Sequence, residues 1–172
     1  EYYRSKADYQ PFFANGYEII PLEFGANVLI YYPVKGPTRD IDYIFLGSHN
    51  WDEYVRYFPT IFQDYVGFIA GSGWSHAEWV GKHLHRYLYA RSKIGLNIHG
   101  TEHKRQPSEL TERTYILAAS GVPQVVDNPK LLWRRFSPDS LFCGETPEQY
   151  VSLFRHAIAN PAEAVQRALL AQ

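Results

Sequence analysis

The sequence has little sulfur, no charge excess and no long apolar run, and each shortage excludes a class of protein. Its 172 residues include a single cysteine, Cys143, so no disulfide framework can form within the chain. One thiol suits a reducing compartment, and we expect a cytoplasmic location. The 17 basic and 18 acidic side chains give a net charge of -1, so no overall basic field attracts nucleic acid or an anionic membrane.

Long apolar runs and methionine are also missing. No run approaches the roughly eighteen residues of a membrane-spanning helix, so no transmembrane segment is expected. The first residues, EYYRSKADYQ, form neither a basic leader nor an apolar signal core. The absence of methionine, even at position 1, indicates a chain that begins partway through a larger protein. A hydrophobic content of 45% is sufficient for one domain with a substantial core.

From Asp42 onward, short apolar runs alternate with longer segments of helical spacing. The predicted strands cover residues 42–47, 66–70, 93–98, 122–126 and 140–143. Short, mostly apolar runs are typical of strands that are covered on both faces. The sequence therefore predicts an α/β fold, a Rossmann-like parallel sheet flanked by helices.

Helix signals divide the rest of this region. Asn50, Thr146 and Asn160 are predicted N-caps, each with Glu or Gln three residues later. Pro59 should kink or divide its segment. Residues 1–41 show no sustained helical period, and we expect a connector with at most one or two strands, such as one over residues 27–32.

Residues 109–127, ELTERTYILAASGVPQVVD, join a polar first turn to an apolar helix. Ser108 is a plausible N-cap and Gly121 a plausible stop, which predicts a helix over residues 109–120. Because this helix follows the predicted strand 93–98, its free N–H groups should lie at the carboxyl edge of the sheet, where ligands bind.

Three charged residues, Glu109, Glu112 and Arg113, would share one face of the first turns of this helix. A carboxylate there can accept hydrogen bonds from sugar hydroxyls, and a guanidinium can bind a phosphate with two donors. The alternative is local: the acids stabilise the helix dipole, and Arg113 is their ion-pair partner.

Two segments in this order, YARSKIGLNIHG and ERTYILAASGVPQVVD, resemble the carboxyl-terminal half of group 1 glycosyltransferases of the GT-B fold. The resemblance is strongest to the subgroup named after a spore-maturation protein. IPLEFGANVLIYYP resembles the interdomain connector, DYIFLGS and IAGSGW the first two strands with their loops, and FCGETPEQYVSLFRHAIANP the closing strand and helix.

The resemblance implies an activity and a division of the chain. Residues 42–172 would be the donor-binding domain of a glycosyltransferase, which transfers a sugar from a nucleotide-diphosphate sugar to an acceptor. Residues 1–41 would be the interdomain connector and the end of an N-terminal acceptor domain that the chain lacks. No metal or other cofactor is implied.

The resemblance also implies the site residues. Its catalytic candidates are Glu109 and Arg113, which would face the sugar and the diphosphate. Its binding candidates are Gly47 and Ser48 for the phosphates, Gly71, Ser72, Gly73 and Trp74 in the second loop, Asn97 and His99 at a strand end, and Glu112 and Thr114 in the helix.

One position departs from the family pattern. The family has a glutamate for the ribose hydroxyls directly after the Arg-Thr-aromatic triplet, and this chain has Ile116 there. An isoleucine cannot accept those hydrogen bonds. The departure favours an alternative function, a non-catalytic Rossmann-like binding or interaction module that has lost nucleotide binding, unless Glu112 or another group substitutes.

Other motifs keep two interpretations. Residues 71–74 are either a phosphate-side loop or a tight turn with a packed tryptophan. The basic segment 81–93 either contacts phosphates, a membrane surface or nucleic acid, or is a solvated helix with Leu84, Tyr87 and Leu88 buried. His99 is either a polar group of the cleft or a histidine of a surface loop. The histidines have no metal-ligand spacing, and no metal site is expected.

Overall fold

The computed structural model describes residues 9–18, 24–36, 38–49, 57–74, 80–99, 110–127 and 129–172. Five strands form one sheet: β1 (Ile41–Leu46), β2 (Gly67–Ala70), β3 (Ser92–Asn97), β4 (Gln124–Val126) and β5 (Phe142–Cys143). The helices are α1 (Gln10–Ala14), α3 (Pro59–Asp64), α4 (Lys82–Arg91), α6 (Glu112–Ala119), α7 (Pro129–Arg135), α8 (Pro147–Ala159) and α9 (Pro161–Ala171).

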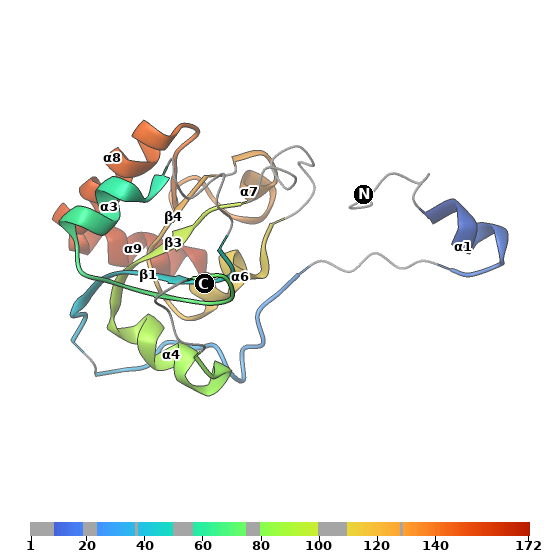
Figure 1. The fold of residues 1–172 in the computed structure, drawn as a ribbon, viewed down its shortest axis with the longest axis horizontal. Coiled ribbons are helices and arrows are strands. Elements are labelled where there is room, and N and C mark those ends of the chain that lie inside the picture. The colour runs from blue at the N-terminus through green and yellow to red at the C-terminus, as the bar shows by residue number, and fades with distance from the viewer. Residues whose placement is uncertain are drawn as a thin grey trace.

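The sheet is parallel throughout, with the strand order β2-β1-β3-β4-β5. Figure 1 shows β1, β3 and β4 between helix α8 and helix α4. The five predicted strands and the predicted α/β class are thus confirmed. The chain first moves from β1 to one edge, and after β2 it crosses to the other side of β1. This reversal places a topological switch point between β1 and β3, where open α/β sheets bind their ligands.

Helices cover both faces of the sheet, as the apolar alternation within β1 requires. Tyr43 and Phe45 point to a core cluster that also contains Phe154 of α8. Ile44 points to the opposite face and clusters with Tyr89 of α4 and Leu117 of α6. Neighbouring side chains of a strand point to opposite faces, so one strand supplies both cores.

Gly95 of β3 lets helix α6 approach the sheet closely. A β-carbon at Gly95 would lie 2.5 Å from one methyl group of Leu117 and 2.8 Å from the other. Only glycine leaves room for this contact. The position of α6 above the strand ends therefore depends on a residue inside the strand.

The predicted helix starts are confirmed at Thr146 and Asn160. The hydroxyl of Thr146 accepts a hydrogen bond from the Gln149 N–H at 3.3 Å and caps α8. Asn160 precedes α9, but its side chain donates to the His156 carbonyl at 2.8 Å and caps no amide. Pro59 is the first residue of α3. Asn50 lies outside the described residues.

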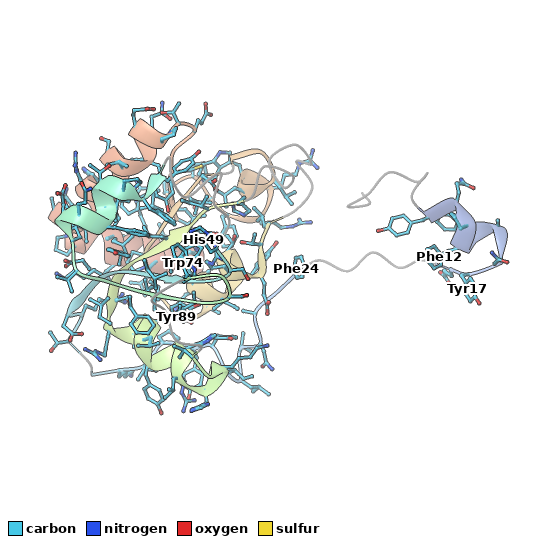
Figure 2. All side chains as sticks on the ribbon, in the orientation of Figure 1. Phe12, Tyr17, Phe24, His49, Trp74 and Tyr89 are labelled. Carbon is cyan, nitrogen blue, oxygen red and sulfur yellow. The ribbon has the colours of Figure 1, made fainter. Side chains whose placement is uncertain are left out.

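The structure corrects the predicted strand at residues 27–32. The Asn27 carbonyl accepts hydrogen bonds from the N–H groups of Ile30 and Tyr31, and its side chain accepts one from Leu29, so residues 28–30 form a turn. Asparagine favours such local bonds over a strand. Farther toward the N-terminus, α1 lies away from the sheet and buries none of its residues, and Phe12 and Tyr17 are exposed (Figure 2).

Helix α6 begins at Glu112, three residues later than the sequence predicts. Its N-cap is Thr111, and the preceding residue, Leu110, is buried in an apolar cluster with α7 residues. The predicted helix start at residue 109 is therefore wrong, and Glu112 and Arg113 are the first two residues of the helix. Glu109 itself, like Ser108, lies outside the described residues.

Candidate functional site

A cavity of about 480 Å³ lies at the carboxyl edge of the sheet, beside the switch point. It is bounded by the loops after β1 and β2, by one side of α4 and by the first turns of α6. Its lining residues are Tyr31, Leu46, Gly47, Ser48, Ala70, Gly71, Ser72, Val80, Lys82, His85, Tyr89, Thr111, Glu112, Arg113 and Ile116. The predicted candidates among them are Gly47, Ser48, Gly71, Ser72, Glu112 and Arg113.

Arg113 joins α6 to the ends of two strands. Its Nε donates to the Leu46 carbonyl at 3.0 Å, and its Nη1 lies 3.4 Å from the Ile98 carbonyl. The guanidinium carbon is 4.1 Å from the centre of the Phe45 ring, a cation–π distance. These contacts hold the guanidinium in one place, and no described residue accepts a hydrogen bond from Nη2.

The first glycine loop brings backbone against this guanidinium. A β-carbon at Gly47 would lie 3.0 Å from Cζ of Arg113 and closer still to Nη2. Gly71, in the second loop, has a φ of 141° and packs against the carbonyl of Gly47. Both loops depend on glycine for this close approach, and together they form the cavity wall opposite α6.

One half of the second loop, residues 71–74, lines the cavity, and the other half packs against the core. Gly71 and Ser72 line the cavity, whereas Gly73 and Trp74 do not. The indole N–H of Trp74 donates to the Gly47 carbonyl at 2.9 Å, and its ring centre lies 4.3 Å from that of His49, nearly perpendicular to it (Figure 2). The predicted turn with a packed tryptophan is therefore confirmed for this half of the motif.

Asn97 and Thr114 do not line the cavity. Both are fully buried, and the Asn97 amide donates to the Thr114 hydroxyl at 2.8 Å and to the Gln124 side chain at 3.2 Å. Asn97 also accepts a hydrogen bond from the Thr111 hydroxyl at 3.3 Å. A direct contact with a ligand would break these bonds. The geometry instead makes both residues supports of α6.

His99 is buried as well, and its partner is Asp127. The Asp127 carboxylate accepts hydrogen bonds from the His99 backbone N–H at 3.0 and 3.1 Å and lies 2.8 Å from the ring Nδ1. The other ring nitrogen, Nε2, accepts a hydrogen bond from the Thr111 N–H at 3.3 Å. His99 lies in the loop after β3, as expected, but its side chain is buried, so the prediction of a surface loop histidine is wrong. Its ring bonds to protein groups and does not line the cavity.

The sequence missed an aromatic side of the cavity, formed by Tyr31, His85 and Tyr89. The Tyr31 hydroxyl lies 3.5 Å from Nδ1 of His85. Burial raises the pKa of Tyr31, and the carboxylate of Glu112 raises it further. Burial also raises the pKa of Tyr89, although Arg113 opposes the shift. Both tyrosines therefore keep their hydroxyl protons at neutral pH. Because Nε2 of His85 donates to the Val80 carbonyl, the Tyr31 hydroxyl donates its proton to Nδ1 of His85, and its oxygen can accept a hydrogen bond from a ligand. The Tyr89 hydroxyl can donate one.

His85 is uncharged at neutral pH. Burial lowers its pKa, more than its hydrogen bond to the Val80 carbonyl raises it, and the neighbouring Lys82 lowers it further. The cationic groups that line the cavity are therefore Lys82 and Arg113.

The orientation of α4 explains why this side was missed. The sequence predicts that Leu84 and Tyr87 are buried, but they are 46% and 47% exposed, whereas Tyr89 is buried. The only sequence signal for the true arrangement was the density of polar and aromatic side chains in residues 81–93. The periodicity of this segment did not show which face meets the sheet.

Ile116 lines the cavity one helical turn after Glu112. It is 7% exposed and belongs to the apolar cluster that contains Tyr31, Leu117 and Val122. This part of the wall offers a ligand no carboxylate. The nearest acidic group on the same helix face is Glu112, because residues four apart are neighbours on a helix.

The described part of the chain contains no group of three His, Cys, Asp or Glu side chains that could hold a metal ion. None of its helices has the length and apolar character needed to span a bilayer. Cys143 is partly buried, and burial raises the pKa of its thiol to about 12. The polar groups of the cavity therefore remain the candidates for chemistry.

The fold is a parallel doubly wound α/β sheet, and the cavity at its switch point is lined by glycine loops, an arginine and the first residues of a helix. The model of the glycosyl transferase-like family matches residues 38–172 of the chain. The protein belongs to this family. No curated protein matches the sequence.

Proposed function

We propose that residues 42–172 bind a nucleotide-diphosphate sugar and transfer its sugar to an acceptor. Residues 1–41 would connect this domain to an N-terminal acceptor domain, and the chain would belong to the GT-B subgroup named after a spore-maturation protein. The observation that carries the proposal is the guanidinium of Arg113, held at the start of α6 and against the glycine loop after β1.

The chemistry of transfer gives these groups a role. When the bond between the anomeric carbon and the diphosphate oxygen breaks, negative charge accumulates on the leaving nucleoside diphosphate. A fixed guanidinium and the N–H groups of a helix start stabilise that charge where it develops. The acceptor oxygen forms the new bond and loses its proton to a base, which we place in the acceptor domain.

The aromatic side of the cavity would receive the hydroxyl-bearing part of the donor. The Tyr89 hydroxyl is a hydrogen-bond donor, and the Tyr31 oxygen and the Glu112 carboxylate are acceptors at the same edge of the cavity. This combination suits a ribose or a sugar diol. It offers a substitute for the carboxylate that is missing at Ile116.

Calorimetric titration of the chain with UDP, GDP and ADP tests the proposal. We expect one nucleotide to bind, and Arg113→Ala to weaken it by about 1.5 to 3 kcal/mol, since a hydrogen-bonded charge is lost. Arg155→Ala is the matched control, because Arg155 pairs with Asp64 on the protein surface and does not line the cavity. Equal weakening by both substitutions would contradict the proposal, and so would no binding of any nucleotide.

The second candidate function is a non-catalytic module that has lost nucleotide binding, and the apolar wall at Ile116 favours it. Ile116→Glu distinguishes the two, with Ile116→Gln as a control for size and polarity. The module predicts no nucleotide binding by the native chain and measurable binding only after Ile116→Glu. Strong binding by the native chain, unchanged in this variant, excludes the module.

A further inference from the structure

His99 cannot serve a ligand in the cavity directly, because it has no exposed surface. Asp127 accepts hydrogen bonds from its backbone N–H and lies 2.8 Å from its Nδ1. The two residues follow neighbouring parallel strands, β3 and β4, whose register pairs Asn97 with Val126. This pairing brings the carboxylate beside the imidazole and fixes the orientation of the ring.

The hydrogen bonds also determine which ring nitrogen carries the proton. A carboxylate only accepts, so Nδ1 donates to Asp127, and the unprotonated Nε2 is left as an acceptor. Its partner is the backbone N–H of Thr111, at 3.3 Å. The imidazole therefore connects the end of β4 with Thr111, the N-cap residue of α6.

The hydroxyl of Thr111 does not cap the helix that this residue precedes. Its side chain caps no amide of α6 and instead donates to Asn97 at 3.3 Å. Glu112 and Arg113 follow immediately and line the cavity. A displacement of Thr111 would move both side chains, because the backbone geometry of a helix fixes its first residues relative to the N-cap.

We propose that His99 is a positioning residue: the chain of contacts from Asp127 through His99 to the Thr111 N–H fixes where α6 begins. In this way it places Glu112 and Arg113 at the cavity. The placement of α6 is a property of the protein with or without a ligand, and its effect on nucleotide affinity rests on the function proposed above.

Two substitutions of His99 separate its contact with Asp127 from its contact with the Thr111 N–H. In His99→Gln, the side-chain oxygen lies near the place of Nε2 and can accept from the Thr111 N–H. In His99→Asn, the amide nitrogen lies near the place of Nδ1 and can donate to Asp127, but nothing reaches Thr111. Both variants keep a polar, uncharged group in the core, so each is the control for the other.

The first measurement is amide hydrogen exchange of the full chain, residue by residue and without ligand. We expect the Thr111 amide in His99→Asn to exchange at least about fivefold faster than in His99→Gln, the factor for one lost hydrogen bond. The amides of Leu96 and Val125, inside β3 and β4, should not differ between the variants. Equal exchange at Thr111 in the two variants would overturn the proposal.

The second measurement is calorimetric titration of both variants with whichever of UDP, GDP and ADP the native chain binds. We expect about fivefold weaker binding by His99→Asn than by His99→Gln. If the two variants bind the nucleotide equally well but differ in Thr111 exchange, the position of the helix start does not govern binding. This result would overturn the proposed effect of His99 on nucleotide affinity. If the native chain binds none of the three nucleotides, the proposed function fails, while amide exchange still decides the positioning role.

A variant pair at Thr111 keeps the proposal testable if neither His99 variant folds. Thr111 has a φ of -65°, which proline adopts, so Thr111→Pro removes the N–H donor, and Thr111→Ala removes only the hydroxyl. We expect Thr111→Pro to raise the exchange rate of the Thr114 amide, which donates to the Thr111 carbonyl at 3.0 Å, about fivefold above that in Thr111→Ala. Equal rates in this pair would overturn the proposal.

Discussion

The carboxyl edge of the sheet contains two polar regions that differ in what they contact. The open loops, residues 47–48 and 71–72, line the cavity. The buried polar cluster, which we define as Asn97, His99, Thr114, Gln124 and Asp127, is 0% to 4% exposed and does not line it. The open loops follow β1 and β2, whereas the buried polar cluster comes from β3, β4, the residues just after these strands and α6. Residues of both regions were predicted from the sequence to contact a ligand.

The difference shows that a strand end can serve a site in two ways. Where the chain has glycine, backbone comes to the cavity surface because no side chain stands in front of it. Where the chain has Asn or His beside other polar side chains, these groups bond to one another and hold the neighbouring helix. The open loops would contact the ligand, and the buried polar cluster would position α6.

The largest expected effect is on stability, from Asn97→Leu. This substitution keeps the side-chain volume but removes the bonds to Thr114, Gln124 and Thr111. Because it leaves buried groups unpaired, we expect the free energy of unfolding to fall by about 3 kcal/mol. Urea denaturation measures this change. A loss below about 1 kcal/mol would show that the buried polar cluster does not hold the fold.

Gly47→Ala should have the opposite profile, a large effect on binding and a small one on stability. The added methyl group would displace the guanidinium of Arg113, whose Cζ would lie 3.0 Å away. We expect about tenfold weaker nucleotide binding, or about 1.4 kcal/mol, with a smaller change in unfolding.

Gly25→Ala is the matched control for this substitution, because no heavy atom lies within 4 Å of the β-carbon it would add. Titration and urea denaturation of both variants separate the two effects. If Gly47→Ala lowers the free energy of unfolding but leaves the nucleotide affinity unchanged, the open loops and the buried polar cluster do not differ in their roles.

The smallest effect is expected from Glu112→Gln. Glu112 is exposed, and its charge acts on the helix dipole, so its contribution to stability should be about 0.5 kcal/mol. If its carboxylate accepts a bond from a ligand hydroxyl, affinity for a ribonucleotide should fall about threefold, and affinity for the 2′,3′-dideoxy form should not change. Equal losses for both nucleotides would show that Glu112 does not contact the diol.

The sequence predicted the elements better than their boundaries. The five strands were found because short apolar runs, each covered on two faces, leave a local pattern. Thr146 was found as an N-cap for the same reason, since its partner Gln149 is three residues away. The strand over residues 27–32 was wrong, because the side chain of Asn27 forms a turn that outweighs the apolar run after it.

The site was predicted unevenly. Gly47, Ser48, Gly71, Ser72, Glu112 and Arg113 line the cavity, as the resemblance implied. The resemblance also implied ligand contacts for Asn97, His99 and Thr114, but their side chains bond to buried protein groups. Tyr31, His85 and Tyr89 were missed because they come to the cavity from the connector and from α4, which are far from the predicted loops in sequence.

The sequence alone determined the alternation of strands and helices, the parallel class of the sheet and the glycine loops, because spacing and turn residues act over a few positions. The tertiary structure decided which polar groups face the cavity and where α6 begins. Those properties depend on three contacts: the close packing of Leu117 against Gly95, the burial of Leu110 in an apolar cluster, and the hydrogen bond between His99 and Asp127. Each is a contact between segments that only the folded sheet brings together.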